Sequence, residues 1–347
     1  MQQLLVMRRL FSRTVDIGLL PLVLVLLLTG FSGVELARRP AKADHFVDYR
    51  AVAGTVLGSA TETEEEPPLA PEDFETRCHK EGVLVCEGFD SADKFKPATD
   101  PGSGLYPAWD GKYRGTLDVS VTASGGGSLK FTIPTYSAAN SAGYWKQAMG
   151  KNFGEGSTFY VQFRQRFSPE MLTNSWGVDT YWKQVIIHNG PQTCADVELA
   201  TINQHRAGYP TMYSQCGSDN FYDDLHNGDF LMEQGDFNCH YHKINARDCF
   251  MYPANEWITF YYKVRIGHWG KADSTIQAWV ALPGKPYKQW IKMINHKLFN
   301  ASPGNDYDTV TLLVYMTAKD ATKNGGPTAY TWYDELIVSQ QAIAPAA

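Results

Sequence analysis

The chain has 347 residues, of which 44% are hydrophobic and 20% are charged, and its formal net charge is −6. This length suffices for one large β domain with appendages, and a net negative charge without a long basic run argues against a general nucleic-acid binder. Aromatic residues reach 13%, which suits an all-β protein whose aromatic side chains fill a core or line a binding surface.

The N-terminus has the pattern of an export signal. Basic residues that include the pair Arg8-Arg9 precede an apolar run over residues 17–28, and Ala41-Lys42-Ala43 provides an A-x-A cleavage site. The arginine pair weakly resembles a twin-arginine signal. An uncleaved anchor is the alternative, because the apolar run, if continued, nearly reaches the length that spans a bilayer. Residues 1–43 are therefore predicted to be a signal peptide or N-terminal anchor, and the rest of the chain is predicted to be secreted or extracellular.

Residues 44–76 are predicted to form a flexible acidic, Pro-rich linker. The segment Ala60–Pro71 is rich in Glu, Thr and Pro and has no pattern that could form a core. The folded domain is predicted to occupy residues 77–341.

Six cysteines follow the linker, at positions 78, 86, 194, 216, 239 and 249. In an exported protein they are expected to form disulfides. The short separations favour pairing Cys78 with Cys86 and Cys239 with Cys249. A zinc site is the alternative, since His240 and His242 lie beside two of the cysteines, but no C-x-x-C spacing supports it.

From about residue 83 the chain consists of short β-type runs separated by Gly, Pro, Asn and Asp. The runs are Val83–Cys86, Leu117–Thr122, Ser128–Ile133, Phe159–Phe167, Tyr181–His188, Val197–Ile202, Trp257–Ile266, Thr275–Ala281, Val310–Thr317 and Tyr330–Ser339. Many short strands with turns between them predict an all-β sandwich, jelly roll or barrel. The section His205–Asn255 lacks clear strands and is interpreted as a disulfide-stapled loop beside a binding face.

Two of these runs have an apolar face and a polar face. In Phe159–Phe167 the polar face carries Arg164 and Arg166, and in Tyr181–His188 it carries Gln184 and His188. If the apolar faces share one core, the opposite face of the sheet is polar and cationic. Such a face suits an anionic, hydroxyl-rich ligand.

Later strands extend the same pattern. The polar-face residues that they contribute are Tyr261, Lys263, Arg265, Gln277, Trp279 and Tyr315. An ordinary solvated sheet face is the simpler explanation. That explanation predicts mostly Thr, Ser, Glu and Lys, whereas the Arg, His, Tyr and Trp found here favour a ligand groove.

The order of these strands resembles the concanavalin A-like jelly-roll polysaccharide lyases of the alginate-lyase and glucuronan-lyase type. An arginine strand with Arg164 and Arg166 comes first, the strand Gln184–His188 follows, and Tyr261-x-Lys263 comes late. The opening VCEGFDSADKF and the closing TAYTWYDELIVS are similar to the paired terminal strands of that fold. The resemblance covers about residues 83–339. In the alginate type the Gln and His are two residues apart, whereas here they are four apart.

The resemblance implies a concanavalin A-like β-sandwich jelly roll that cleaves a uronate polysaccharide by β-elimination. The carboxylate must be neutralised, a base must take the C5 proton, and an acid must protonate the leaving oxygen. Arg166, with Arg164 or Gln184, is expected to neutralise the carboxylate, and His188 is expected to be the base. Tyr261 or Tyr315 is expected to be the acid, or both base and acid in a syn elimination.

The substrate-binding residues are then expected to be Arg164, Lys263, Arg265, Gln277, Trp279 and Tyr315. No cofactor is required, but the resemblance implies a structural calcium held by Asp90 or Asp334. The expected partner is an acidic polysaccharide, and neither nucleic acid nor a protein partner is implied.

Two other readings stay open. A non-catalytic, lectin-like carbohydrate-binding module would use the same groove. A glycoside hydrolase would need paired carboxylates, and Glu198 and the pair Asp334-Glu335 are the best-placed acids for that chemistry.

Overall fold

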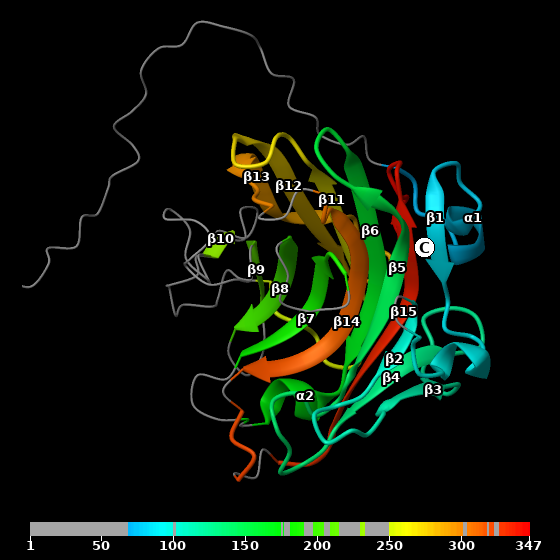
Figure 1. Ribbon diagram of the computed structural model, residues 1–347. Coiled ribbons are helices and arrows are strands. Elements are labelled where there is room, and N and C mark those ends of the chain that lie inside the picture. The colour runs from blue at the N-terminus through cyan, green and yellow to red at the C-terminus, as the bar shows by residue number, and fades with distance from the viewer. Residues whose placement is uncertain are drawn as a thin grey trace, which may run out of the picture. The chain divides into compact units, whose positions relative to one another are not determined.

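A computed structural model describes residues 69–99, 102–174, 176, 181–190, 197–204, 209–214, 230–232, 250–300, 304–317, 319–322 and 326–347 (Figure 1). The chain divides into two units, residues 1–63 and 64–347, and every described residue belongs to the second unit. The predicted signal or anchor, most of the predicted linker and four of the six cysteines lie outside the described residues. Among the helices that are described, none is long and apolar enough to cross a membrane.

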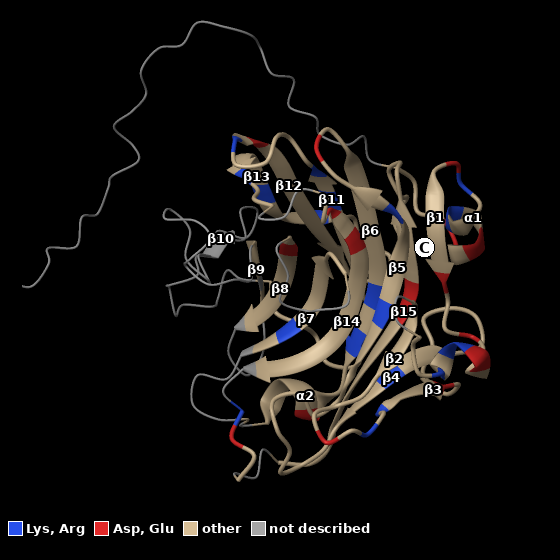
Figure 2. Cartoon of the chain, in the orientation of Figure 1, with Lys and Arg blue, Asp and Glu red and all other residues tan. Residues whose placement is uncertain are grey.

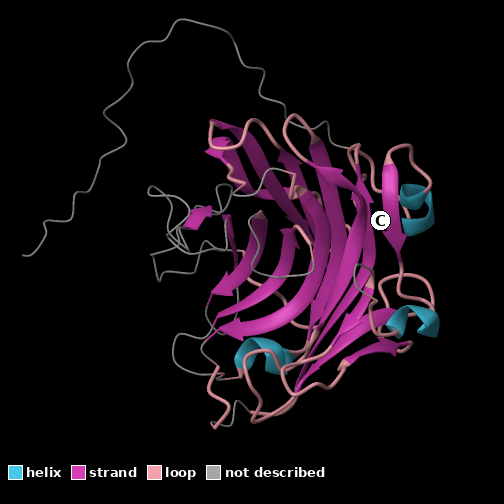
Figure 3. Cartoon of the chain, viewed as in Figure 1, coloured by secondary structure: helices cyan, strands magenta, loops and turns pink. Residues whose placement is uncertain are grey.

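Two antiparallel sheets dominate the described residues (Figure 3). The eight-stranded sheet has the order β13 (Lys288–Lys297), β12 (Ala272–Ala281), β11 (Ile258–Arg265), β6 (Thr158–Phe167), β15 (Ala329–Ser339), β4 (Ser128–Ile133), β3 (Gly115–Asp118), with β1 (Val83–Glu87) also paired to β15. The seven-stranded sheet has the order β10 (Phe230–Met232), β9 (Tyr209–Ser214), β8 (Glu198–Gln204), β7 (Tyr181–His188), β14 (Tyr307–Thr317), β5 (Tyr144–Phe153), β2 (Gly104–Tyr106).

The helices are short. They are α1 (Phe74–Cys78), the 3₁₀ turn η2 (Ala92–Phe95) and α2 (Pro169–Thr173). The side chain of Asp73 accepts a hydrogen bond from the Thr76 amide and so caps α1, and Ser168 caps α2 in the same way.

The core lies between the two sheets, as the alternation of apolar residues predicts. Phe159, Val161 and Phe163 of β6 share one buried cluster with Val185 and Ile187 of β7. Each sheet buries one face against the other, which defines a β-sandwich. The predicted all-β, jelly-roll fold class is confirmed, and so is the pairing of the terminal strands, because β1 is antiparallel to β15.

An irregularity in the seven-stranded sheet decides which side chains share a face. The register of β7 shifts between Lys183 and Val185 where it pairs with β8, so Gln184 is an extra residue in the strand. The β14 register shifts between Leu312 and Tyr315. A β-bulge of this kind reverses the alternation of side chains on one side of the extra residue.

The two shifts leave carbonyl groups that a regular ladder would have paired, and Tyr333 reaches them from the opposite sheet. Its hydroxyl lies 2.8 Å from the Gln184 carbonyl oxygen and 2.9 Å from the Leu313 carbonyl oxygen. Because buried carbonyls need a donor, this tyrosine holds the bulge in place. Burial raises the pKa of Tyr333 well above its ordinary value, so the hydroxyl keeps the proton it donates.

Sequence patterns missed some strands. In β5 the core residues Trp145, Met149 and Phe153 are separated by polar positions, so no apolar alternation is visible. The strands β2 and β13 were not predicted either, and β9 and β10 lie inside the section that was interpreted as a loop without strands. That interpretation is wrong for residues 209–214 and 230–232.

The outer face of the eight-stranded sheet is covered by α1 and by the C-terminal segment. Tyr160, Tyr261 and Ile337 of the sheet form a buried cluster with Ile343, and Phe74 packs against it. The Glu72 amide donates to the Pro345 carbonyl at 2.9 Å, so ordered structure begins inside the predicted linker.

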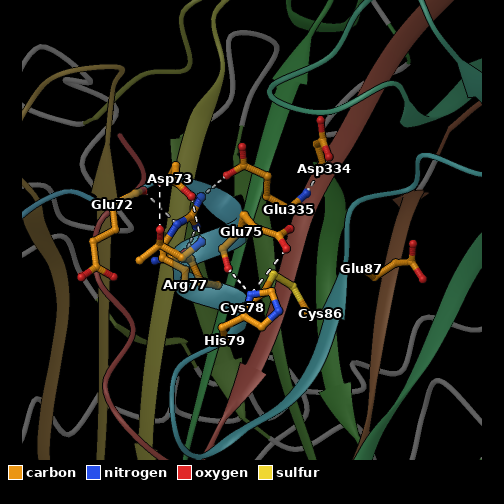
Figure 4. The surroundings of a disulfide bond; sticks show 12 residues. Glu72, Asp73, Glu75, Arg77, Cys78, His79, Cys86, Glu87, Asp334 and Glu335 are labelled. Carbon is orange, nitrogen blue, oxygen red and sulfur yellow. Dashed lines mark hydrogen bonds and ion pairs between the residues drawn. A yellow bond between two sulfur atoms is a disulfide. The ribbon is translucent and has the colours of Figure 1, made fainter.

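A buried ionic cluster fixes α1 to this face (Figure 4). The Arg77 guanidinium donates to Glu335 and to Gln162, and Arg164 lies 3.3 Å from the same Glu335 carboxylate. The predicted disulfide between Cys78 and Cys86 is confirmed and ties α1 to β1. The predicted pairing of Cys239 with Cys249 lies outside the described residues.

Glu335→Gln is expected to destabilise the fold by about 3–5 kcal/mol, because it leaves two buried guanidinium groups without their carboxylate. The control is Lys80→Ala, which removes a surface pair with Glu72 whose lysine side chain is 52% exposed and which should cost at most about 1 kcal/mol. Urea unfolding monitored by tryptophan fluorescence measures both. Equal losses in the two variants would contradict the structural role assigned to the buried cluster.

Candidate functional site

The predicted site residues are divided between the two sheets. On the eight-stranded sheet lie Arg164, Arg166, Tyr261, Lys263, Arg265, Gln277 and Trp279, and on the seven-stranded sheet lie Gln184, His188 and Tyr315. Figure 2 shows Lys and Arg positions on both sheets. Because the sheets pack through their apolar faces, their polar faces point away from each other. The expectation that all these residues line one groove is therefore wrong.

Tyr261 is buried beneath the C-terminal segment rather than exposed to a ligand. It is 2% exposed, and its hydroxyl accepts a hydrogen bond from the Ile343 amide at 3.2 Å. Its ring stacks with Tyr160 and Tyr287, with centroids 6.1 and 5.5 Å apart, and lies 5.3 Å from Trp279. These contacts pack the outer face of the eight-stranded sheet.

The arginines of β6 also have structural partners. Arg164 pairs with Glu335 at 3.3 Å, and Arg166 lies 3.5 Å from the Asn255 side-chain oxygen and 5.9 Å from the Trp332 ring. These interactions leave both guanidinium groups on the face opposite to His188.

The remaining predicted binding residues follow the same division. Lys263 lies 5.9 Å from the Tyr160 ring, Arg265 donates to the Asp273 carbonyl at 2.8 Å, and Gln277 is 4% exposed. All three belong to β11 or β12, on the eight-stranded sheet.

Gln184 does not share a face with His188, because the bulge turns its side chain into the core. The Gln184 Oε1 atom accepts a hydrogen bond from the Tyr252 hydroxyl at 2.7 Å, and Tyr252 belongs to the central apolar cluster. The prediction that Gln184 and His188 point the same way is therefore wrong. The same bulge brings Lys183 onto the face of His188.

The outer face of the seven-stranded sheet carries a cluster of titratable side chains, which we call the lysine–histidine cluster: Lys146, Lys183, His188, Glu198 and Tyr213. The Tyr213 hydroxyl donates to Glu198 Oε1 at 3.1 Å, and Lys183 Nζ lies 3.5 Å from that oxygen and 5.3 Å from the Tyr213 ring centroid. His188 and Glu198 are directly opposite each other on β7 and β8. The cluster combines two ammonium groups, a carboxylate, a phenol and an imidazole.

The partners of His188 define its tautomer. Nδ1 lies 2.9 Å from the Asn189 carbonyl oxygen, which can only accept, so Nδ1 carries the proton. Nε2 lies 2.7 Å from Thr311 Oγ1 and accepts the hydroxyl proton. Burial lowers the pKa of His188 to about 4, with smaller contributions from the charges of Lys146 and Lys183. The imidazole is therefore neutral at neutral pH.

A cavity of about 310 Å³ opens next to this cluster at one end of the sheet. Lys146, Lys151, Tyr106 and Thr309 line it. The Lys146 ammonium lies 4.8 Å from the Tyr106 ring, and Thr309 is opposite His188 on the neighbouring strand. The cavity is large enough for part of a sugar ring, and its lining carries two lysines and one carboxylate, that of Asp308.

Asp90 and Asp334, the predicted calcium ligands, accept hydrogen bonds from the backbone of a nearby loop. Asp90 Oδ1 accepts the amides of Gly126 and Gly127. Asp334 Oδ2 accepts the Ala123 amide at 2.8 Å, and burial raises the pKa of Asp334 to about 7. Backbone amides thus already donate to Asp90 Oδ1 and to Asp334, and the structural calcium stays a prediction.

Within the described residues, no group of three or more His, Cys, Asp or Glu side chains is placed to hold a metal ion. The segment that contains Cys239, His240 and His242 lies outside the described residues.

Comparison with solved structures finds lyases with similar chain folds. The chain is similar to the marine PL-14 alginate lyase from Aplysia kurodai, at 10% identity and a TM-score of 0.49, over 74% of this chain and 98% of that chain. It is also similar to the endo-β-1,4-glucuronan lyase from the fungus Trichoderma reesei, at 11% identity and a TM-score of 0.44, over 75% of this chain and 96% of that chain. A third similar structure is alginate lyase Aly36B, at 10% identity and a TM-score of 0.40, over 75% of this chain and 97% of that chain.

No protein-family model matches the chain, and no curated protein matches it. At the identities and TM-scores above, similarity assigns no activity to this chain. The functional interpretation therefore depends on its own residues.

Sequence patterns did not identify Lys146, Lys183 or Tyr213 as site residues, and Glu198 was considered only for a hydrolase. By regular alternation along the strand, Lys183 would lie on the face opposite to His188, and only the bulge brings the two side chains onto one face. Tyr213 lies in a section read as a loop, and Lys146 lies in a strand that was not predicted. The one available signal was that Lys183 immediately precedes the Gln184–His188 run.

The stability of the protein is expected to depend on pH through His188. The unfolded imidazole binds a proton near pH 6.5 but the folded one only near pH 4, so the unfolded state binds more protons between these values. The stability that neutral His188 contributes is present above about pH 6.5 and is lost as the pH falls toward 4. Relative to His188→Gln, the wild type should lose about 2 kcal/mol between about pH 6.5 and about pH 5.

Urea unfolding of both proteins across this pH range measures the difference. Other groups with shifted pKa values, such as His296 and Asp334, are present in both proteins, so their contributions cancel in the comparison. A difference that does not change with pH would show that His188 titrates normally in the folded state.

Proposed function

We propose that this protein binds an acidic polysaccharide on the outer face of its seven-stranded sheet and cleaves it by β-elimination. The observation that carries the proposal is the lysine–histidine cluster. Two ammonium groups, Lys146 and Lys183, flank a buried neutral imidazole, and a phenol lies beside one of them. This set contains each group that the elimination of a uronate requires.

The first requirement is to neutralise the uronate carboxylate, so that the proton on C5 can be removed. Lys146 and Lys183 supply positive charge from β5 and β7, near enough to His188 for both charges to lower its pKa. An ammonium group that faces the carboxylate stabilises the negative charge that develops when C5 loses its proton. In this proposal the lysines replace Arg164, Arg166 and Gln184 in the role predicted for them.

The second requirement is a base, and we keep His188 in that role. The Thr311 hydroxyl donates a hydrogen bond to the lone pair of Nε2, and the two atoms are 2.7 Å apart. Rotation of the threonine side chain about its Cα–Cβ bond would free this lone pair to accept a proton. A pKa of about 4 describes a weak base. The negative charge of a bound uronate would favour the imidazolium and so strengthen the base when the substrate is present.

The third requirement is an acid for the leaving oxygen, and we assign this role to Tyr213, whose hydroxyl lies within the cluster and donates to Glu198. In the elimination the C5–H bond breaks, its electron pair forms the C4–C5 double bond, and the bond from C4 to the glycosidic oxygen breaks. The oxygen then takes the phenolic proton. The Lys183 ammonium, 5.3 Å from the ring, stabilises the phenolate that forms. Tyr213 thus replaces Tyr261 in this role.

The test is an assay of the purified protein on alginate and glucuronan, with ultraviolet absorbance of the new double bond as readout and mass spectrometry of the products. Lys183→Ala and Tyr213→Phe are each expected to lower the turnover by at least about 100-fold, because each removes a group that acts in the transition state. Tyr261→Phe is the matched control, since it removes a phenol from the other sheet and should retain turnover.

Each other outcome contradicts the proposal in a different way. Retained binding without unsaturated products would indicate a carbohydrate-binding module. Saturated products would indicate hydrolysis. Loss of turnover in Tyr261→Phe alone, with activity kept in Tyr213→Phe, would place the reaction on the eight-stranded sheet.

A further inference from the structure

The loop after β2 presents a tryptophan to solvent at the other end of the proposed binding face. Trp109 is 65% exposed, although an indole of this size is usually buried in a folded protein. Its ring lies 5.8 Å from the Tyr315 ring, in an edge-to-face arrangement. A single exposed apolar residue needs no explanation, but an exposed tryptophan in contact with a second aromatic ring of a binding face does.

Tyr315 connects Trp109 to the lysine–histidine cluster. It is opposite Lys183 in the pairing of β14 with β7, and it packs against the apolar residues that surround Tyr213 on the outer face. Thr309, at the cavity, and Tyr315 are both on β14, so they lie about 20 Å apart along the strand. The cationic cavity and Trp109 thus lie toward opposite ends of one continuous face.

The backbone that carries Trp109 is anchored. The Trp109 amide donates to the Asn140 carbonyl at 3.1 Å, and the Met316 amide donates to the Ala139 carbonyl at 3.0 Å. These bonds join the Trp109 loop, the segment around residue 140 and the end of β14. The exposed ring is therefore held by an ordered framework.

Lys319 adds further contacts to the segment around residue 140. Its ammonium donates to Ser137 Oγ at 2.6 Å, lies 3.4 Å from Ser141 Oγ, and lies 4.8 Å from the Trp176 ring. Next to Ser137, Tyr136 is 60% exposed and has a φ of 49°, a left-handed conformation that costs free energy for a bulky residue. An exposed aromatic residue that is kept in a strained conformation in this segment is a further sign of a binding surface.

We propose that Trp109, with Tyr315 in contact with it, is a stacking subsite for a sugar ring beyond the ring that reacts, at the Lys183 end of the lysine–histidine cluster. The face of a pyranose ring presents C–H groups, and these pack on the face of an indole while the hydroxyls remain in water. The nearby charges of Arg114 and Asp110 are paired with each other at 2.6 Å, so the surface offers stacking rather than charge. The inference rests on the proposed polysaccharide function of the same face.

The experiment compares Trp109→Ala and Trp109→Phe with the wild type on alginate and glucuronan, both as polymers and as oligosaccharides of increasing length. Trp109→Ala should weaken binding of the polymer and of long oligosaccharides about tenfold. It should leave the binding of the shortest oligosaccharides and the turnover number unchanged. Trp109→Phe should restore most of the loss, because it keeps an aromatic face. Ile294→Ala, which removes an exposed apolar side chain (53% exposed) from the other sheet, is the matched control.

Binding is measured directly by affinity electrophoresis and calorimetry, so the subsite is tested even if no elimination occurs. Weaker polymer binding by Trp109→Ala without any unsaturated product would support the subsite and overturn the lyase proposal. Unchanged polymer binding, or an equal loss for short and long chains, would overturn the subsite whether or not the protein is a lyase. A change in oligomeric state in Trp109→Ala, measured by sedimentation, would instead assign the surface to self-association and also overturn it.

Discussion

The extra residue in β7 is the constraint on which the candidate site depends. Without it, Lys183 would point into the core, and Gln184 would lie beside His188. With it, the lysine and the histidine share the outer face, while the Gln184 side-chain oxygen accepts a hydrogen bond from Tyr252 inside the sandwich. The bulge is stable because Tyr333, from the opposite sheet, supplies a hydroxyl to carbonyls at the irregularity. A core residue of one sheet thus determines which charges appear on the far side of the other.

Charged side chains have different roles on the outer faces of the two sheets. On the eight-stranded sheet, two buried guanidinium groups meet one carboxylate and fasten the chain ends. On the seven-stranded sheet, two ammonium groups flank an imidazole that burial keeps neutral. A cavity lined by Lys146, Lys151 and Asp308 opens on this sheet, whereas α1 and the C-terminal segment cover the outer face of the other sheet. This contrast is the reason for assigning ligand binding to the seven-stranded sheet.

Sequence alone predicted the fold class, most of the strand positions and the disulfide between Cys78 and Cys86. These follow from local features, because the period-two alternation of β6 and β7 and the short spacing of two cysteines are visible along the chain. The partners of each strand are not local. Alternation shows that Arg164 and Phe163 face opposite ways, but it does not show that β6 and β7 belong to different sheets. The alternation of side chains is also interrupted at a bulge, and nothing in the sequence around Gln184 marks this residue as an extra one.

The covering of the eight-stranded sheet has a consequence for how the molecule forms. Arg77 and Glu335 are 258 residues apart in sequence, and β15 is the partner of β1, β4 and β6. The sheet therefore lacks a central strand until nearly the whole domain has been synthesised, and α1 has no surface to dock on before then. Contacts of such long sequence range make folding slow and leave strand edges open in the meantime. The nascent chain should thus depend on protection from aggregation until its last strand is available.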